Sequence, residues 1–128
     1  REAAAVLQDR KISPQTQFII IPSSQAVYDE ADRRGYLTIL KHAGATVRDE
    51  IACSACIGDG PDAVQAGEIA VSATNRNFIG RMDPSKQGEV YLAGSIITSL
   101  TALQGKIPNV EQYRIEVERI VGNLQKLS

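Results

Sequence analysis

Three short apolar runs stand out along the chain, each flanked by polar or turn-forming residues. Residues 17–22 (QFIIIP) form a continuous run of β-branched and aromatic side chains, which is typical of a strand buried on both faces of a sheet. Residues 68–72 (EIAVS) predict a second buried strand. Residues 89–93 (EVYLA) predict a last strand, and residues 45–48 (ATVR) are a shorter candidate. We therefore predict that the strands at 17–22, 68–72 and 89–93 share one mostly parallel sheet.

Helical patterns fill most of the remaining chain. Residues 1–10 are rich in strong helix formers, and residues 110–124 interleave apolar and charged side chains as an amphipathic helix does. Further helices are predicted after the capping serines Ser23 and Ser24 up to Gly35, over 36–42, and over 96–103. Because strands alternate with helices, the sequence predicts a three-layer α/β/α domain.

Composition narrows the classes of function. The chain has 128 residues, of which 43% are hydrophobic and 23% charged, with a net charge of −1, as expected for one globular domain. This charge balance does not favour a nucleic-acid partner, because proteins that bind the phosphate backbone usually carry a net positive charge. The longest apolar runs, of about five residues, are far shorter than the roughly 20 residues of a membrane span. We expect a soluble, cytoplasmic protein.

The start of the chain carries a further expectation. Arg1 and Glu2 begin inside a helical pattern, without a start methionine and without the features of a signal peptide. We therefore expect residues 1–128 to be a single domain and a C-terminal fragment of a larger protein.

Two cysteines, Cys53 and Cys56, are spaced C-x-x-C and are the only ones in the chain. A redox pair normally opens a helix, but Gly58, Gly60 and Pro61 follow directly and prevent a long one. A tetrahedral zinc site needs four ligands, and the chain adds a single histidine. An iron–sulfur cluster needs at least three thiolates, so it requires a further cysteine outside these residues. Two buried structural cysteines are the remaining interpretation.

The segment from Asn75 to Arg81 (NRNFIGR) holds a second group of candidate residues. A guanidinium makes planar two-donor contacts with carboxylates, so two converging arginines, Arg76 and Arg81, suit a small di- or tricarboxylate. A solvated loop with one salt bridge at a helix end is the alternative. Because this segment and the cysteines both follow predicted strands, we expect them to meet at one edge of the sheet, where ligands collect.

Taken together, these segments resemble a known family. The chain resembles the third domain of the aconitase superfamily in the order and spacing of four motifs. These are Cys53-x-x-Cys56-Ile57-Gly58, Gly67-Glu68, residues 72–81 (SATNRNFIGR) and residues 89–93. The C-x-x-C pair alone is weak evidence, but joined to Asn-Arg-Asn-Phe-x-Gly-Arg it is specific. The spacing most resembles large subunits of the 3-isopropylmalate dehydratase type, up to about Ile107. The tail after Pro108 has no match in this pattern.

The resemblance implies a fold and a chemistry. It implies an aconitase-type iron–sulfur domain in which Cys53 and Cys56 hold a [4Fe–4S] cluster, with the third cluster cysteine upstream of Arg1. One iron without a protein ligand would bind the substrate hydroxyl and carboxylate, so that water can be removed and returned at the neighbouring carbon. Arg76 and Arg81 would bind the substrate carboxylates, and Asn75 would support the cluster or the adjacent arginine.

The same resemblance implies partners for this domain. The catalytic base would be a serine on a small subunit or a swivelling domain, with no counterpart in this chain. The substrate would be a 2-hydroxy dicarboxylate, and the hydro-lyase reaction would convert 2-isopropylmalate to 3-isopropylmalate in leucine biosynthesis. Homoaconitate, citrate and dimethylmalate stay open as substrates, and a non-catalytic iron-binding or interaction domain is the alternative of a different class. The fragment alone is expected to lack both cluster and activity.

Overall fold

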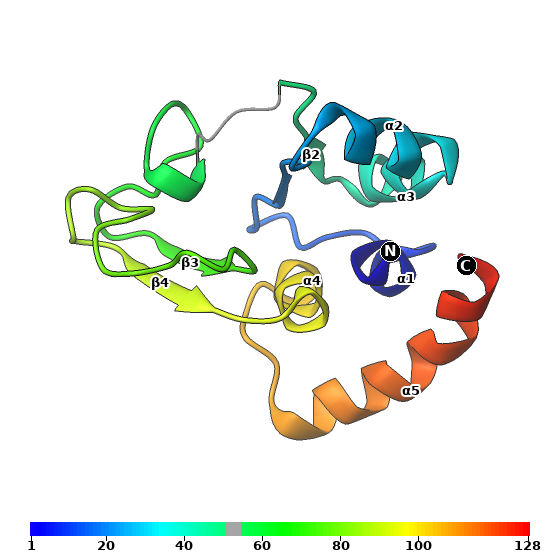
Figure 1. Cartoon of the computed structure of the whole chain (residues 1–128). Coiled ribbons are helices and arrows are strands. Elements are labelled where there is room, and N and C mark those ends of the chain that lie inside the picture. The colour runs from blue at the N-terminus through cyan, green and yellow to red at the C-terminus, as the bar shows by residue number, and fades with distance from the viewer. Residues whose placement is uncertain (51–54) are drawn as a thin grey trace. The chain divides into compact units, whose positions relative to one another are not determined.

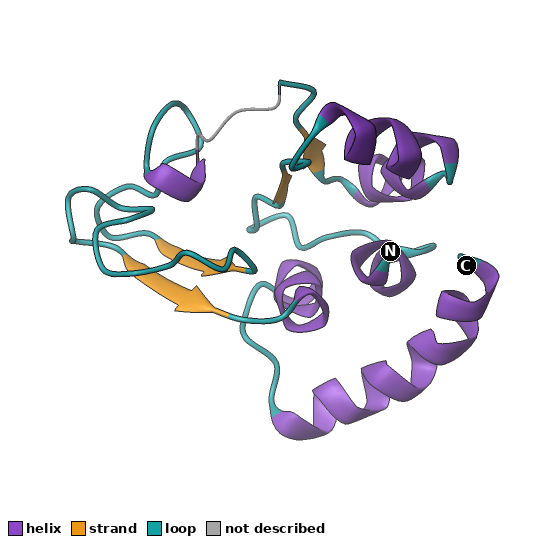
Figure 2. Ribbon diagram, viewed as in Figure 1, coloured by secondary structure: helices purple, strands orange, loops and turns teal. Residues whose placement is uncertain are grey.

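The computed structural model describes residues 1–50 and 55–128, which divide into two compact units (Figure 1). Unit 1 comprises residues 1–50 and 95–128 of the described chain, and unit 2 comprises residues 55–94. Helices dominate unit 1, whereas unit 2 consists mainly of loops around one pair of strands (Figure 2).

Unit 1 confirms the predicted helices and two of the predicted strands. Its elements are α1 (Glu2–Leu7), β1 (Ile19–Ile20), α2 (Gln25–Arg33), α3 (Tyr36–Ala43), β2 (Thr46–Val47), α4 (Ser95–Gln104) and α5 (Val110–Lys126). β1 and β2 pair in parallel, with Ile19 opposite Thr46 and Ile20 opposite Val47.

The short helix α1 is the centre of unit 1. Residues 4–7 are fully buried, because α3, α4 and α5 all pack against this helix. The small side chains of Ala4 and Ala5 allow neighbouring helices to approach closely, while Val6 and Leu7 fill the space between them. α1 is therefore buried on every side, and not only on the one apolar face that its sequence suggests.

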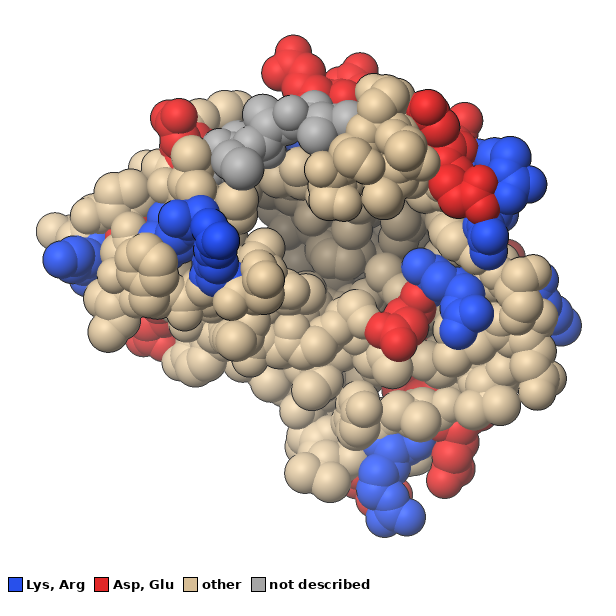
Figure 3. Space-filling view, viewed as in Figure 1, with Lys and Arg blue, Asp and Glu red and all other residues tan. Residues whose placement is uncertain are grey.

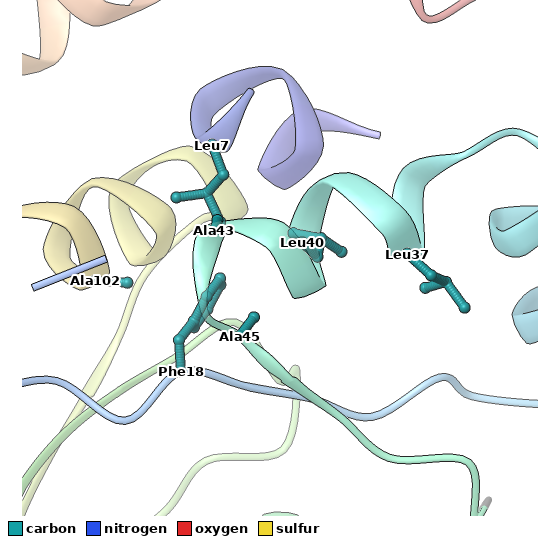
Figure 4. Close-up of a cluster of buried hydrophobic side chains, with 7 residues drawn as sticks. All are labelled: Leu7, Phe18, Leu37, Leu40, Ala43, Ala45 and Ala102. Carbon is teal, nitrogen blue, oxygen red and sulfur yellow. The ribbon is translucent and has the colours of Figure 1, made fainter. Parts of the chain in front are cut away.

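Two clusters of buried side chains form the core of unit 1. The first surrounds the C-terminal half of α3, and its members come from several elements (Figure 4): Leu7, Phe18, Leu37, Leu40, Ala43, Ala45 and Ala102. The second consists of Ala5, Val6, Leu100 and Ile120, and therefore joins α1, α4 and α5. Burying apolar surface of this kind contributes about 25 cal/mol per Å², so these contacts are the main stabilisation of unit 1.

The helix ends of unit 1 follow the sequence signals. The Val27 N–H donates to Ser24 Oγ at 3.2 Å at the start of α2. Gly44, with φ +105°, ends α3 in the left-handed conformation that glycine adopts without strain. At the start of α5, Asn109 and Gln112 form a reciprocal capping box. The tail that has no match in the family pattern thus begins with a well-capped helix.

Among its described residues, unit 2 contains one helical turn and one pair of strands. Its elements are η1 (Ala55–Ile57), β3 (Ile69–Ser72) and β4 (Glu89–Leu92). The two strands are parallel, with Ile69 opposite Glu89 and Ser72 opposite Leu92. In the described chain, the crossover between Ser72 and Glu89 is a loop without a helix, unlike most parallel connections.

The parallel direction of the strands is confirmed, but the prediction of one shared sheet is wrong. β1 pairs with β2, and β3 pairs with β4, in two separate sheets of two strands. Pro22 lacks an N–H group and cannot extend the β1 ladder. The described residues between β2 and β3 form turns and η1, without the long helix that usually carries a parallel crossover within one sheet.

The degree of strand burial also differs from the prediction. Ile69 at the start of β3, a strand predicted to be buried, is 69% exposed, and Leu92 in the neighbouring β4 is 61% exposed. β-branched composition therefore identified the strands correctly but not their surroundings. Within the described chain, no helix is long and apolar enough to cross a membrane.

Candidate functional site

The cysteine turn, defined here as residues 55–58, carries the one cysteine that the structure describes. Cys56 lies in η1, is partly buried and has a free thiol. The Gly58 N–H donates to the Ala55 carbonyl oxygen at 3.2 Å, and Gly58 has φ +66°. Gly58 thus ends the helical turn after Ile57, as the sequence indicates. Cys53, the other predicted cluster ligand, lies outside the described residues.

The Asn-Arg segment leaves β3 through a turn made by hydroxyl groups. The Thr74 N–H donates to Ser72 Oγ at 3.2 Å, and the two side-chain oxygens lie 2.9 Å apart. Asn75 and Arg76 follow this turn and are exposed. Among the described residues, the Arg76 guanidinium makes no hydrogen bond or ion pair. Its charge is therefore available to a ligand.

Arg81 is placed differently, because it contacts the cysteine turn. Its Nε–H donates to the Cys56 carbonyl oxygen at 2.9 Å, and its guanidinium carbon lies 5.8 Å from the centre of the Phe78 ring. The second contact is within the range of cation–π attraction. The structure thus brings Cys56 and Arg81 together, although they are far apart in sequence.

A buried carboxylate organises the loop after Arg81. Asp83 is 2% exposed and accepts hydrogen bonds from Ser85 N–H (2.9 Å), Ser85 Oγ (2.5 Å) and Gly88 N–H (2.5 Å). The Ser85 hydroxyl, followed by the Gly88 amide, holds the pKa of Asp83 below its ordinary range. Asp-Pro-Ser is the composition of an Asx turn, so the sequence holds a local signal for this role.

Beside this loop lies a small hollow of about 130 Å³. The residues lining it come from the Asn-Arg segment, from the loop after Arg81 and from β4: Asn77, Phe78, Ile79, Gly80, Asp83, Lys86, Gly88 and Val90. On the face visible in Figure 3, Lys and Arg side chains are spread among Asp and Glu side chains, and some of them lie over the part of the molecule that contains β3 and β4. The lining of the hollow holds one exposed cation, Lys86, and one buried carboxylate, Asp83, so an anionic ligand would find a single charged partner there.

The donor atoms allow a test of fit to a metal cluster. In residues 1–50 and 55–128, no group of three or more His, Cys, Asp or Glu side chains could hold a metal ion. The whole chain has two thiols, and a [4Fe–4S] cluster is held by at least three. Cys56, free and partly exposed on a tight turn, fits the position of one such ligand. These residues therefore fit part of a cluster site.

Comparison with known proteins now identifies the class. The sequence model of the aconitase family (aconitate hydratase) matches residues 1–105, so this chain belongs to the aconitase family. The match ends just before α5 begins at Val110.

Several relatives are named as large subunits of 3-isopropylmalate dehydratase. The 3-isopropylmalate dehydratase large subunit of a Nitratiruptor species is 42% identical over 105 residues, covering 82% of this chain and 24% of the relative. Those of Campylobacter curvus and Pyrococcus furiosus (large subunit 1) are 43% and 41% identical, covering 84% and 88% of this chain. The chain thus spans about a quarter of the length of the curated relatives it matches.

Proposed function

We propose that this chain is part of a [4Fe–4S]-dependent hydro-lyase that dehydrates and rehydrates a 2-hydroxy dicarboxylate, converting 2-isopropylmalate to 3-isopropylmalate. The observation that carries the proposal is the hydrogen bond from Arg81 Nε to the Cys56 carbonyl oxygen. It joins a residue type that binds carboxylates to a turn that can supply a thiolate ligand. Membership of the aconitase family and the names of the relatives support the same reaction.

The cysteines are the proposed cluster ligands. Cys53 and Cys56 would hold two of the irons, with a third thiolate from a cysteine outside these 128 residues. When bound, such a cluster supplies a Lewis-acidic iron that polarises the substrate hydroxyl. The contribution of the cysteine turn is to fix the direction of one ligand, because a short glycine-limited turn has few alternative backbone conformations.

The arginines are the proposed substrate ligands. Arg76 and Arg81 would each bind a substrate carboxylate and orient the dicarboxylate relative to the cysteines. Asn75, directly before Arg76, would support that arginine or the cluster through its side-chain amide. A charge-assisted, two-donor contact is both stronger and more directional than a neutral hydrogen bond, so this pair can fix a small acid in one orientation.

The remaining parts of the enzyme lie outside this chain. We propose that residues 1–128 form a single domain and a C-terminal part of a large subunit, and that a small subunit or swivelling domain supplies the catalytic serine. The relatives named as large subunits support a small-subunit partner. We further propose that the complete enzyme acts in the cytoplasm. The 128 residues alone would hold no cluster and turn over no substrate.

Reconstitution of the complete enzyme tests this function. The full-length chain and its small subunit are combined without oxygen, supplied with iron and sulfide, and assayed on 2-isopropylmalate, homoaconitate, citrate and dimethylmalate. We expect the fastest turnover with 2-isopropylmalate. A cluster-loaded complex that converts none of the four acids would instead favour a non-catalytic iron-binding domain.

Lysine substitution tests the arginines in the same complex. Arg76→Lys keeps the positive charge but loses the planar two-donor contact, and we expect kcat/KM to fall roughly thirty-fold or more. Arg81→Lys should cause a loss of the same order. The assay compares kcat/KM of each variant with that of the unaltered complex, at equal iron content. Near-normal rates would remove the arginines from the substrate site.

A further inference from the structure

Arg81 is held through both its side chain and its main chain. Besides the bond to Cys56 and the contact with Phe78, its backbone N–H donates to the Phe78 carbonyl oxygen at 2.9 Å. The side chain is partly buried. A long side chain that is bound at Nε and packed on a ring has lost most of its rotational freedom before any ligand arrives.

A second, independent contact joins the cysteine turn to the loop at Arg81. A Cβ added to Gly58 would lie 2.5 Å from Pro84 Cδ and 2.9 Å from the Arg81 carbonyl oxygen. Those distances are shorter than van der Waals contact, so only glycine allows the two backbones to approach this closely. The cysteine turn and the loop at Arg81 therefore make two contacts: the Arg81 side chain binds the Cys56 carbonyl oxygen, and Gly58 packs closely against residues 81 and 84.

We propose that Arg81 is a positioning residue for Cys56 as well as a ligand for carboxylate. Its Nε–H fixes the backbone of the cysteine turn, and the close packing at Gly58 keeps that turn in contact with the 81–84 loop. The direction of the Cys56 thiol and the position of the Arg81 guanidinium are then set by one shared arrangement. The role of Arg81 as a carboxylate ligand rests on the proposed function, whereas its role in positioning Cys56 does not.

The bond to Cys56 also determines how Arg81 can bind an acid. A guanidinium offers a carboxylate either Nε with one terminal nitrogen or the two terminal nitrogens together. Because Nε is engaged by the Cys56 carbonyl oxygen, Arg81 is left with the two terminal nitrogens. Arg76, exposed and without such a bond among the described residues, can use either pair. The two arginines are therefore not equivalent.

The exchange of guanidinium protons with water tests the bond directly. In the ¹⁵N spectrum of the 128-residue chain, without cluster or substrate, we expect the Nε–H of Arg81 to exchange at least roughly fivefold more slowly than that of Arg76, the effect of one hydrogen bond. Equal exchange rates for the two groups would overturn the proposal.

The reactivity of the thiol tests the consequence for Cys56. Cys53→Ser leaves Cys56 as the only thiol, and because Cys56 is partly buried its alkylation rate reports how well the turn shields it. We expect Arg81→Met, which keeps side-chain length but removes the donor, to raise that rate roughly fivefold, and the matched variant Arg76→Met to leave it unchanged. The same rate in both variants would contradict a positioning role.

Two glycines provide a matched pair for the backbone contact. Gly58→Ala and Gly67→Ala both place alanine at positive φ, but a Cβ at Gly67 meets nothing within 4 Å. We expect Gly58→Ala to abolish the slow exchange of the Arg81 Nε–H and Gly67→Ala to preserve it. Preservation in both variants would show that the close approach is not needed.

The full-length, cluster-loaded protein separates this inference from the proposed function. We expect Arg81→Met to speed the loss of cluster absorbance to an iron chelator, relative to Arg76→Met. If the complex has no hydro-lyase activity but Arg81 Nε–H is protected, the positioning role stands and the function fails. If Nε–H exchanges as fast as in Arg76, the positioning role fails whatever the activity.

Discussion

The two units are stabilised by different means. Unit 1 buries whole side chains, with Ala5, Val6 and Leu7 inaccessible to solvent. In the described part of unit 2, Ala55 and Val64 are the only apolar side chains that count as buried, and both remain 8% exposed. Unit 2 relies instead on hydrogen bonds between side chains and backbone: Arg81 Nε–H donates to the Cys56 carbonyl oxygen, and the Gly88 N–H donates to the Asp83 carboxylate.

The two kinds of stabilisation suit different purposes. A closely packed helical core resists change but has few polar groups to spare for a ligand. Loops fixed by individual hydrogen bonds can present guanidinium and thiol groups to a substrate, at the cost of lower local stability. Unit 1 is thus the closely packed part of the chain, and the proposed ligands Cys56, Arg76 and Arg81 all lie in unit 2.

The largest expected effect tests the core of unit 1. Leu7→Ala removes a fully buried side chain from the cluster in Figure 4, and we expect a loss of about 2–5 kcal/mol of stability. The matched change in unit 2, Ile69→Ala at a 69% exposed position, should cost within about 0.5 kcal/mol. Urea unfolding followed by circular dichroism measures both. Equal losses would mean that the two units are packed alike.

A smaller effect is expected at the buried carboxylate of unit 1. Glu116 is 5% exposed and accepts hydrogen bonds from Arg10 Nη1 at 2.8 Å and Arg119 Nη2 at 2.6 Å. Burial alone would raise its pKa, but the bonds from Arg119 and Arg10 outweigh burial, so that the pKa lies below its ordinary value. Arg119 Nη2 also donates to the Val6 carbonyl oxygen at 2.8 Å, which ties α5 to the end of α1.

We expect Glu116→Gln to destabilise the chain by about 1–3 kcal/mol, because two guanidinium groups lose a charged partner in a mostly buried place. Glu111→Gln is the control on the same helix, since Glu111 and its partner Arg114 are both about two-thirds exposed. An exposed pair of this kind is worth less than about 1 kcal/mol. Thermal unfolding of both variants makes the comparison, and an equal shift in Tm would deny Glu116 any special role.

The sequence predicted unit 1 better than unit 2, for a physical reason. Apolar periodicity and capping residues such as Ser24 and Asn109 are local signals, and they gave all five helices described. Apolar runs in the sequence also located the segments that form strands. Strand partners depend on contacts between distant residues, and the expected single sheet was wrong because no local signal encodes which strands pair.

The candidate site shows the same limit. The residue types of the Asn-Arg segment and of the C-x-x-C pair were visible in the sequence. The contact between Arg81 and Cys56 confirms that the two segments meet. They do not meet at the edge of one sheet, as was expected, because β2 and β3 belong to separate sheets. The unequal surroundings of Arg76 and Arg81 were not visible, since they depend on where the Cys56 carbonyl oxygen lies. The roles of these residues in binding a cluster and a substrate stay predictions.

The smallest expected effect is the response of the buried carboxylate of unit 2, Asp83, to acid, with Glu116 of unit 1 as the comparison. Asp83 is held by neutral donors, chiefly the Ser85 hydroxyl and the Gly88 amide, and its pKa lies below its ordinary range. A carboxylate whose pKa is lowered by folding stabilises the folded state above the unfolded value of about 3.9. That contribution is lost as pH falls from the unfolded pKa through the folded pKa, because the unfolded state binds more protons than the folded one in that range.

We therefore expect the turn at Asp83 to open more often as pH falls below about 4, while it is unaffected between pH 5 and about 7. Hydrogen exchange of the Gly88 amide, which donates to Asp83 Oδ2, reports this opening after correction for the intrinsic rate. Asp83→Asn should remove the pH dependence and leave exchange fast throughout. Glu116→Gln, in unit 1, should not alter the response at Gly88. If Gly88 protection in the unaltered chain did not change with pH, the charge on Asp83 would have no part in holding this loop.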